Sequence, residues 1–99
     1  MKVHELKIKA KYYSEICKGI KTFELRKNDR DYQVGDIIHF TVIPDETTTE
    51  ETCEGLNTYP NLVRIIYILQ DVPEYGLKEG YCILAIKIAS ISSGVKVGK

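Results

Sequence analysis

The chain has 99 residues, which is enough for one domain with a single hydrophobic core. Its 14 Lys and Arg balance 14 Asp and Glu, and this neutral total excludes strongly basic proteins that coat nucleic acids without specificity. The longest uncharged apolar run is far shorter than the roughly 20 residues that span a membrane, and no apolar signal segment opens the chain. We therefore expect a cytoplasmic protein that does not bind membranes.

Histidine and cysteine are too sparse to suggest a metal centre or a disulfide framework. The chain has two His and three Cys, and the cysteines lie far apart without a Cys-x-x-Cys pair. Cys17 and Cys82 are expected to be small core residues. The sequence therefore predicts neither a metal site nor a cofactor.

The N-terminal segments show two different hydrophobic periods. Residues 3–10 alternate between apolar and polar side chains, which predicts a half-buried strand with His4 on its apolar side. Residues 11–18 follow the i, i+3, i+4 spacing of a short amphipathic helix. Its apolar stripe includes Tyr12 and Tyr13, so we expect both rings to pack in the core.

Four more strands are predicted along the rest of the chain. They cover residues 22–27, 36–43, 61–70 and 81–91. The last two are apolar on both faces, so the sheet must be covered or closed on itself. The acidic stretch 44–60 is expected to be an exposed loop. We predict a mixed α+β, mainly β fold of about five strands with one short N-terminal helix, in one domain (1–91) followed by a flexible tail (92–99).

The charges are distributed unevenly despite the neutral total. Residues 1–42 carry nine Lys or Arg and six acids, whereas residues 43–60 carry five acids and no basic residue. An anionic ligand should therefore meet the N-terminal half of the chain, and the acidic stretch should either be turned away from it or act as a repulsive rim.

The strand at residues 22–27 carries the most informative polar pattern. Thr22, Glu24 and Arg26 project from one face, about 7 Å apart along the strand, and Lys21 lies at its entrance. A hydroxyl, a carboxylate and a guanidinium on one face can bind a base edge, a carbonyl or a phosphate. The alternative is an ordinary solvated face on which Glu24 and Arg26 pair with each other.

Basic and aromatic residues near this strand complete the set of candidate nucleic-acid contacts. That set is Lys21, Thr22, Glu24, Arg26, Lys27, Arg30, Tyr32 and His4. Tyr32 follows the basic turn directly, so its ring is the best candidate for stacking on an unpaired base. His4 is either a hydrogen-bonded interior residue or a ligand contact at the barrel mouth.

The segment from Gly19 to Arg26 reads G-x-K-T-x-E-x-R after a short helix, and Gly35-Asp36 precedes the next strand. This order resembles the ASCH domain of the PUA-like superfamily, and more narrowly a small bacterial and phage subgroup whose function is not established. The resemblance spans roughly residues 3–88. It implies a PUA-like pseudo-barrel with a cleft lined by Lys21, Thr22, Glu24 and Arg26, and RNA or a modified nucleobase as the ligand.

Three functions remain open at this point. The favoured one is a module that binds RNA or a nucleotide-like small molecule without catalysis. Some ASCH relatives instead hydrolyse acetyl amides on cytidine; their lysine corresponds to Lys21, but they have threonine where this chain has Glu24. An amidohydrolase acting on an N-acylated nucleoside would use Lys21 as a base and Glu24 to orient water or substrate. A third possibility is a protein-interaction module that uses the acidic stretch 44–60. The sequence does not predict an oligomeric state.

Overall fold

The computed structural model describes residues 1–91, and the predicted tail of residues 92–99 lies outside that range. Its elements confirm the expected mixed α+β, mainly β fold around one hydrophobic core. In chain order they are β1 (Val3–Lys9), α1 (Ala10–Cys17), β2 (Phe23–Lys27), β3 (Ile37–Ile43), α2 (Glu50–Leu56), β4 (Leu62–Gln70), the 3₁₀ turn η1 (Pro73–Tyr75) and β5 (Tyr81–Ser90). No helix within residues 1–91 is both long and apolar enough to cross a membrane.

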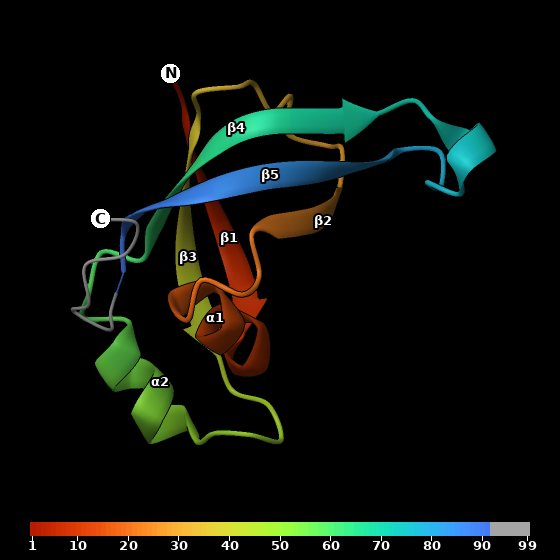
Figure 1. Ribbon diagram of the computed structural model, residues 1–99. Coiled ribbons are helices and arrows are strands. Elements are labelled where there is room, and N and C mark those ends of the chain that lie inside the picture. Colours follow the sequence, from red (N-terminus) through yellow and green to blue (C-terminus); the bar gives the residue numbers. More distant parts are fainter. Residues whose placement is uncertain (92–99) are drawn as a thin grey trace.

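The five strands form one curled sheet, a half-barrel, in the order β1-β3-β4-β5-β2 (Figure 1). β1 and β3 are parallel, and the other three pairs are antiparallel. The long β4–β5 hairpin runs across the β1–β3 pair (Figure 1). β1 and β2 are the two edge strands of this sheet. Because the sheet curls, they nevertheless approach each other in space.

Two arginine side chains bridge these sheet edges. Arg26 on β2 donates from Nη2 to the backbone carbonyl of Lys7 at 2.8 Å, and Arg30 donates from Nη1 to the carbonyl of Glu5 at 3.2 Å. Glu5 and Lys7 are alternate residues of β1, so their carbonyls point the same way. The two guanidinium groups therefore hold β2 beside β1 in place of a backbone ladder.

The core lies on the inner side of the sheet, beneath α1. His4, Leu6 and Ile8 of β1 are buried and alternate with exposed residues, as the sequence predicts. Helix α1 adds Tyr13 and Ile16 to the same cluster. The packing of β1 and α1 against the core positions β2 beside the helix.

Asn61 is a buried polar residue that ties both helices to β3. The Tyr13 hydroxyl donates to Asn61 Oδ1, and Nδ2 donates to the carbonyls of Leu56 at 3.2 Å and Phe40 at 3.5 Å. Its φ of 53° lies in the left-handed region, which Asn tolerates better than most residues. This residue joins segments that are far apart in the sequence.

The prediction of a loop throughout residues 44–60 is wrong, because α2 lies within that stretch. The Thr49 side chain caps the helix by accepting the backbone N–H of Thr52 at 3.1 Å. Cys53 is buried against the core, while the acids of the first turn stay in solvent, where they favour the helix N-terminus.

The segment before α2 also stabilises the start of α1. Asp45 Oδ2 accepts the backbone N–H of Lys11 at 2.8 Å, and Glu46 accepts from Lys11 Nζ at 2.9 Å. Lys9, at the N-cap of α1, makes no side-chain capping bond of its own within residues 1–91. A carboxylate that is distant in the sequence therefore caps this helix.

The expectation that Tyr12 packs in the core is also wrong. Its side chain is 46% exposed, whereas that of Tyr13 is 2% exposed. Adjacent residues of a helix point about 100° apart, so α1 can turn only one of the two rings toward the sheet.

Candidate functional site

Strand β2 turns its charged face inward and its apolar face outward. Glu24 is only 5% exposed, and Arg26 is half-buried. Phe23 and Leu25, on the other face, are 48% and 57% exposed. Glu24 lies opposite Leu84 of β5, which is fully buried, so both side chains share the inner face of the sheet.

Two cations hold the buried carboxylate of Glu24. Lys21 Nζ lies 3.3 Å from Oε2, and Arg26 Nε lies 3.4 Å from Oε1. Lys21 Nζ also donates to the carbonyl of Phe23 at 2.5 Å. Burying a carboxylate is costly unless opposite charges and hydrogen bonds compensate it, and here the three groups leave one net positive charge.

The two cations compensate the buried carboxylate, but the cluster leaves two polar atoms without hydrogen bonds. Glu24 Oε2 and Arg26 Nε are buried atoms with no hydrogen-bond partner among the described residues 1–91. Buried polar atoms are nearly always satisfied in native proteins, so each exception needs an explanation such as a bound water or ligand. The pair of unsatisfied atoms points to a partner from outside the chain.

A hollow of about 340 Å³ borders this carboxylate. It is lined by Tyr12, Lys21, Phe23, Glu24 and Leu25. Lys21 Nζ lies 4.9 Å from the centre of the Phe23 ring and 5.9 Å from that of Tyr12, so the ammonium sits between two aromatic walls. The volume is within the range of small-molecule sites, and the lining combines aromatic surface with a few charged groups.

A second hollow, between α1 and the segment before α2, has a similar volume of about 350 Å³. Of its two charged lining residues, Lys11 is already bound to Glu46, and Glu15 is paired with Lys18 at 3.7 Å. It contains neither of the two unsatisfied buried atoms, so the hollow beside β2 is the stronger candidate.

The structure brings together only some of the predicted site residues. Lys21, Glu24 and Arg26 form one cluster. Thr22 is exposed and lines a smaller hollow of about 170 Å³ on another side of Lys21. Lys27 points to the outer face with Phe23 and Leu25, and Arg30 reaches β1 instead.

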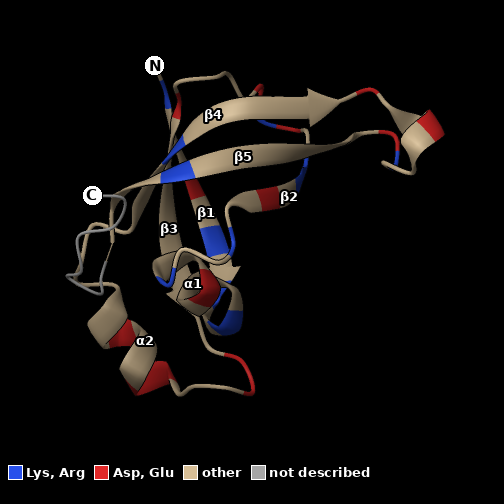
Figure 2. Ribbon diagram, in the orientation of Figure 1, with Lys and Arg blue, Asp and Glu red and all other residues tan. Residues whose placement is uncertain are grey.

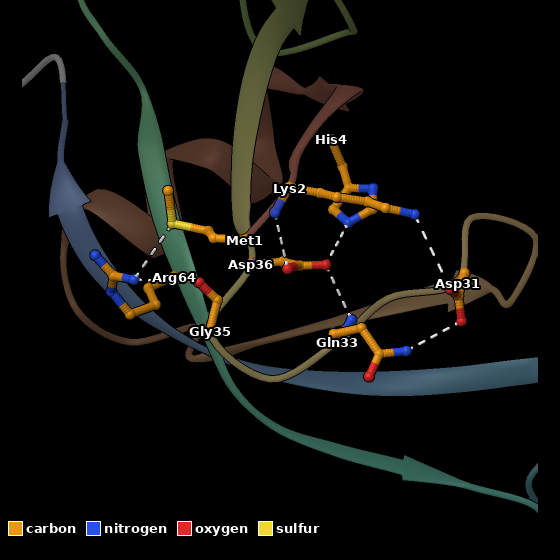
Figure 3. Close-up of polar contacts among 8 residues, drawn as sticks. All are labelled: Met1, Lys2, His4, Asp31, Gln33, Gly35, Asp36 and Arg64. Carbon is orange, nitrogen blue, oxygen red and sulfur yellow. Dashed lines mark hydrogen bonds and ion pairs between the residues drawn. The ribbon is translucent and has the colours of Figure 1, made fainter.

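His4 is a hydrogen-bonded interior residue, which is one of the two alternatives that the sequence leaves open. Its Nε2 donates to Asp36 Oδ2 at 2.8 Å, and both side chains are almost completely buried (Figure 3). Asp36 also accepts the backbone N–H groups of Lys2 and Gln33, each at 3.0 Å. Burial opposes the charge of Asp36, but the hydrogen bonds from His4 and from the two backbone groups outweigh it and lower the Asp36 pKa to about 2. This network joins the N-terminus to the start of β3.

Tyr32, the stacking candidate from the sequence, has a buried ring that offers no free face to a base in this structure. The ring is 6% exposed and packs against His4, with 4.7 Å between ring centres. Burial raises the pKa of its hydroxyl. The accessible aromatic rings beside the charged cluster are instead Tyr12 and Phe23, which the sequence pattern assigned to the core and to the opposite face.

Lys21, Glu24 and Arg26 can form hydrogen bonds and charge pairs with a ligand. Within residues 1–91, no group of His, Cys, Asp and Glu is arranged to hold a metal ion. Cys53 and Cys82 are buried, and burial raises the pKa of both thiols, so neither is an activated nucleophile.

Comparison with known proteins places this chain in a family. Residues 3–86 match the family described as Domain of unknown function (DUF3850). A stretch of 37 residues is 46% identical to a protein of Escherichia phage P2 described as "Uncharacterized 12.9 kDa protein in GpA 3'region". That stretch is 37% of this chain and 34% of the phage protein, so it covers about a third of each. Because the family match covers most of the chain, the protein belongs to the DUF3850 family.

Proposed function

We propose that this protein binds RNA or a modified nucleotide through the hollow beside β2, without catalysing a reaction. The main support is the buried Glu24 carboxylate, which lies between Lys21 and Arg26 and borders a hollow with two aromatic walls. Aromatic rings stack on unpaired bases, and fixed donors and acceptors read base edges. The resemblance to the ASCH domain of the PUA-like superfamily points to the same ligand class.

The distribution of charge supports the approach of an anion to this hollow. Basic residues are placed along β1 and around α1, beside β2, while the acids of α2 and of the preceding loop gather at the end of the molecule away from β2 (Figure 2). A phosphate that approaches β2 therefore meets the basic side of the molecule.

The environment of Lys21 favours binding over amide hydrolysis. A lysine base needs a lone pair directed at the substrate, but Nζ faces the Glu24 carboxylate and the Phe23 carbonyl, which are both acceptors. Lys21 is therefore placed to donate hydrogen bonds. Deacylation of N-acetylcytidine by the wild-type protein, lost in Lys21→Ala, would establish the hydrolase in place of the binding module.

The aromatic wall gives the first test. Binding of a fluorescently labelled, mixed-sequence single-stranded RNA, measured by anisotropy, should weaken about tenfold in Tyr12→Leu because stacking on one ring is lost. Tyr75→Leu is the matched control, since Tyr75 is 83% exposed on η1. Equal affinities for the two variants would count against the hollow beside β2.

The charged cluster gives the second test. Lys21→Gln should weaken the same RNA binding, whereas Lys27→Gln removes an equal charge from the outer face of β2 and should have a smaller effect. A larger loss in Lys27→Gln would move the binding surface to the outer face. Absence of binding to both RNA and nucleotides by the wild-type protein would overturn the proposal.

A further inference from the structure

We infer that the ligand presents an imide edge to this site, that is, an N–H group flanked on both sides by carbonyl oxygens, as in uracil and thymine. This inference rests on the proposed function and names the base that the hollow beside β2 would select. It follows from the order in which donors and acceptors are arranged around Glu24.

The cluster offers a donor, an acceptor and a donor in sequence. The Lys21 ammonium and the Arg26 guanidinium can only donate hydrogen bonds, and an ionised carboxylate can only accept them. Oε2 of Glu24 faces Lys21 at 3.3 Å, and Oε1 faces Arg26 at 3.4 Å, so the acceptor lies between the two donors. A matching ligand edge has an acceptor, a donor and an acceptor.

Among the common bases, only uracil and thymine carry that order on their Watson–Crick edge. Their ring N–H lies between two carbonyl oxygens, so it can donate to Glu24 while the oxygens accept from Lys21 and Arg26. Cytosine would present a ring nitrogen acceptor to the carboxylate and its amino group to a cation. Guanine would direct its amino group at a cation, and adenine has no central donor. Each of these mismatches leaves a buried polar group unpaired, which costs more than a missing contact.

The environment of the carboxylate suits a flat, uncharged group. Within residues 1–91, Glu24 Oε2 and Arg26 Nε have no hydrogen-bond partner, and they are the atoms at which a further hydrogen bond would complete the cluster. The imide carries no charge, so it adds none to the cluster, while Tyr12 and Phe23 offer ring faces beside Lys21. Because solvent does not reach Oε2, entry of the base requires the flexible Lys21 side chain to swing away from the Phe23 carbonyl.

The test compares three nucleotides by isothermal titration calorimetry with the wild-type protein. Uridine 5′-monophosphate has the imide, and 3-methyluridine 5′-monophosphate lacks its N–H. Cytidine 5′-monophosphate has a ring nitrogen acceptor in place of the N–H and an amino group in place of one carbonyl. We expect uridine 5′-monophosphate to bind about tenfold more tightly than either of the others, or better. This ratio of affinities should fall severalfold in Glu24→Gln, an isosteric change that removes the charge of the acceptor. It should stay unchanged in Glu74→Gln, a control on the exposed η1 turn.

The outcomes separate this inference from the proposed function. Equal affinities for the three nucleotides, or a ratio that is unchanged in Glu24→Gln, would overturn the imide assignment. If mixed-sequence RNA still bound and still weakened in Tyr12→Leu, the proposed function would stand without that assignment. Failure of the wild-type protein to bind any of the three nucleotides or RNA would overturn both.

Discussion

The buried Asp36 should make a specific part of the stability depend on acid pH. Its pKa is lowered from 3.8 to about 2, because hydrogen bonds from His4 and two backbone N–H groups outweigh the cost of burial. At about 1.4 kcal/mol for each pKa unit, this shift corresponds to about 2 kcal/mol of stability. Since single domains are stable by only about 5–15 kcal/mol, the effect is large enough to measure.

The sign follows from the direction of the shift. A carboxyl whose pKa is lower in the folded state contributes its full stability above the unfolded pKa near 4, and that contribution is lost as the pH falls through about 2. Asp36→Asn removes this ionisation while keeping the shape of the side chain. Its free energy of unfolding should therefore be lower than that of the wild type at pH 5, and the difference should shrink by about 2 kcal/mol toward pH 2.

The assay is urea denaturation followed by far-ultraviolet circular dichroism at several pH values between 2 and 5. Asp71→Asn, an exposed change in the loop after β4, is the control and should follow the wild type. Equal loss of stability in Asp36→Asn and in the wild type over this range would refute the reasoning. An NMR titration of the Asp36 carboxyl in the wild type would refute it independently if the midpoint were near 4.

Two further predictions concern the contacts that hold the helices in place. Asn61→Ala should lower the free energy of unfolding by about 3 kcal/mol, because buried hydrogen bonds are lost and Ala disfavours the left-handed φ. In urea denaturation, Asn61→Gly isolates the loss of the side chain, and wild-type stability of Asn61→Ala would contradict the role of this residue. Asp45→Ala should speed hydrogen exchange of the Lys11 amide, since the carboxylate that accepts this N–H at 2.8 Å is removed. Asp45→Asn, which keeps an acceptor, should retain more protection, and an unchanged exchange rate in Asp45→Ala would show that the cap does not protect α1.

The longer helices and strands could be predicted because the hydrophobic residues of each recur with a clear period. The strand expected at residues 36–43 is β3 at Ile37–Ile43, and the helix expected at 11–18 is α1 at Ala10–Cys17. Helix α2 was missed because a seven-residue element buries one side chain, Cys53, and such a short helix has little hydrophobic periodicity. Its signal was the Thr49 cap followed by two glutamates.

The candidate site was predictable in part for a similar reason. Alternation along β2 places Glu24 and Arg26 on one face, and Lys21 precedes that strand, so the charged cluster could be expected before its geometry was known. The aromatic walls could not, because the exposure of Tyr12 depends on how α1 is rotated against the sheet. The burial of Tyr32 likewise depends on a contact with His4, 28 positions earlier in the chain.

Local pattern thus determined which side chains of this protein lie together on a strand or helix, since the backbone period alone fixes which neighbours share a side. Whether a given side is exposed to solvent or buried was decided by the curl of the five strands, which brings the edge strands β1 and β2 together. That curl turns the acid of β2 inward between its cations and leaves Phe23 and Leu25 in solvent. The hydrophobicity of the β2 sequence alone would favour the reverse arrangement, with Phe23 and Leu25 buried and Glu24 in solvent. Contacts between distant segments outweigh that preference here.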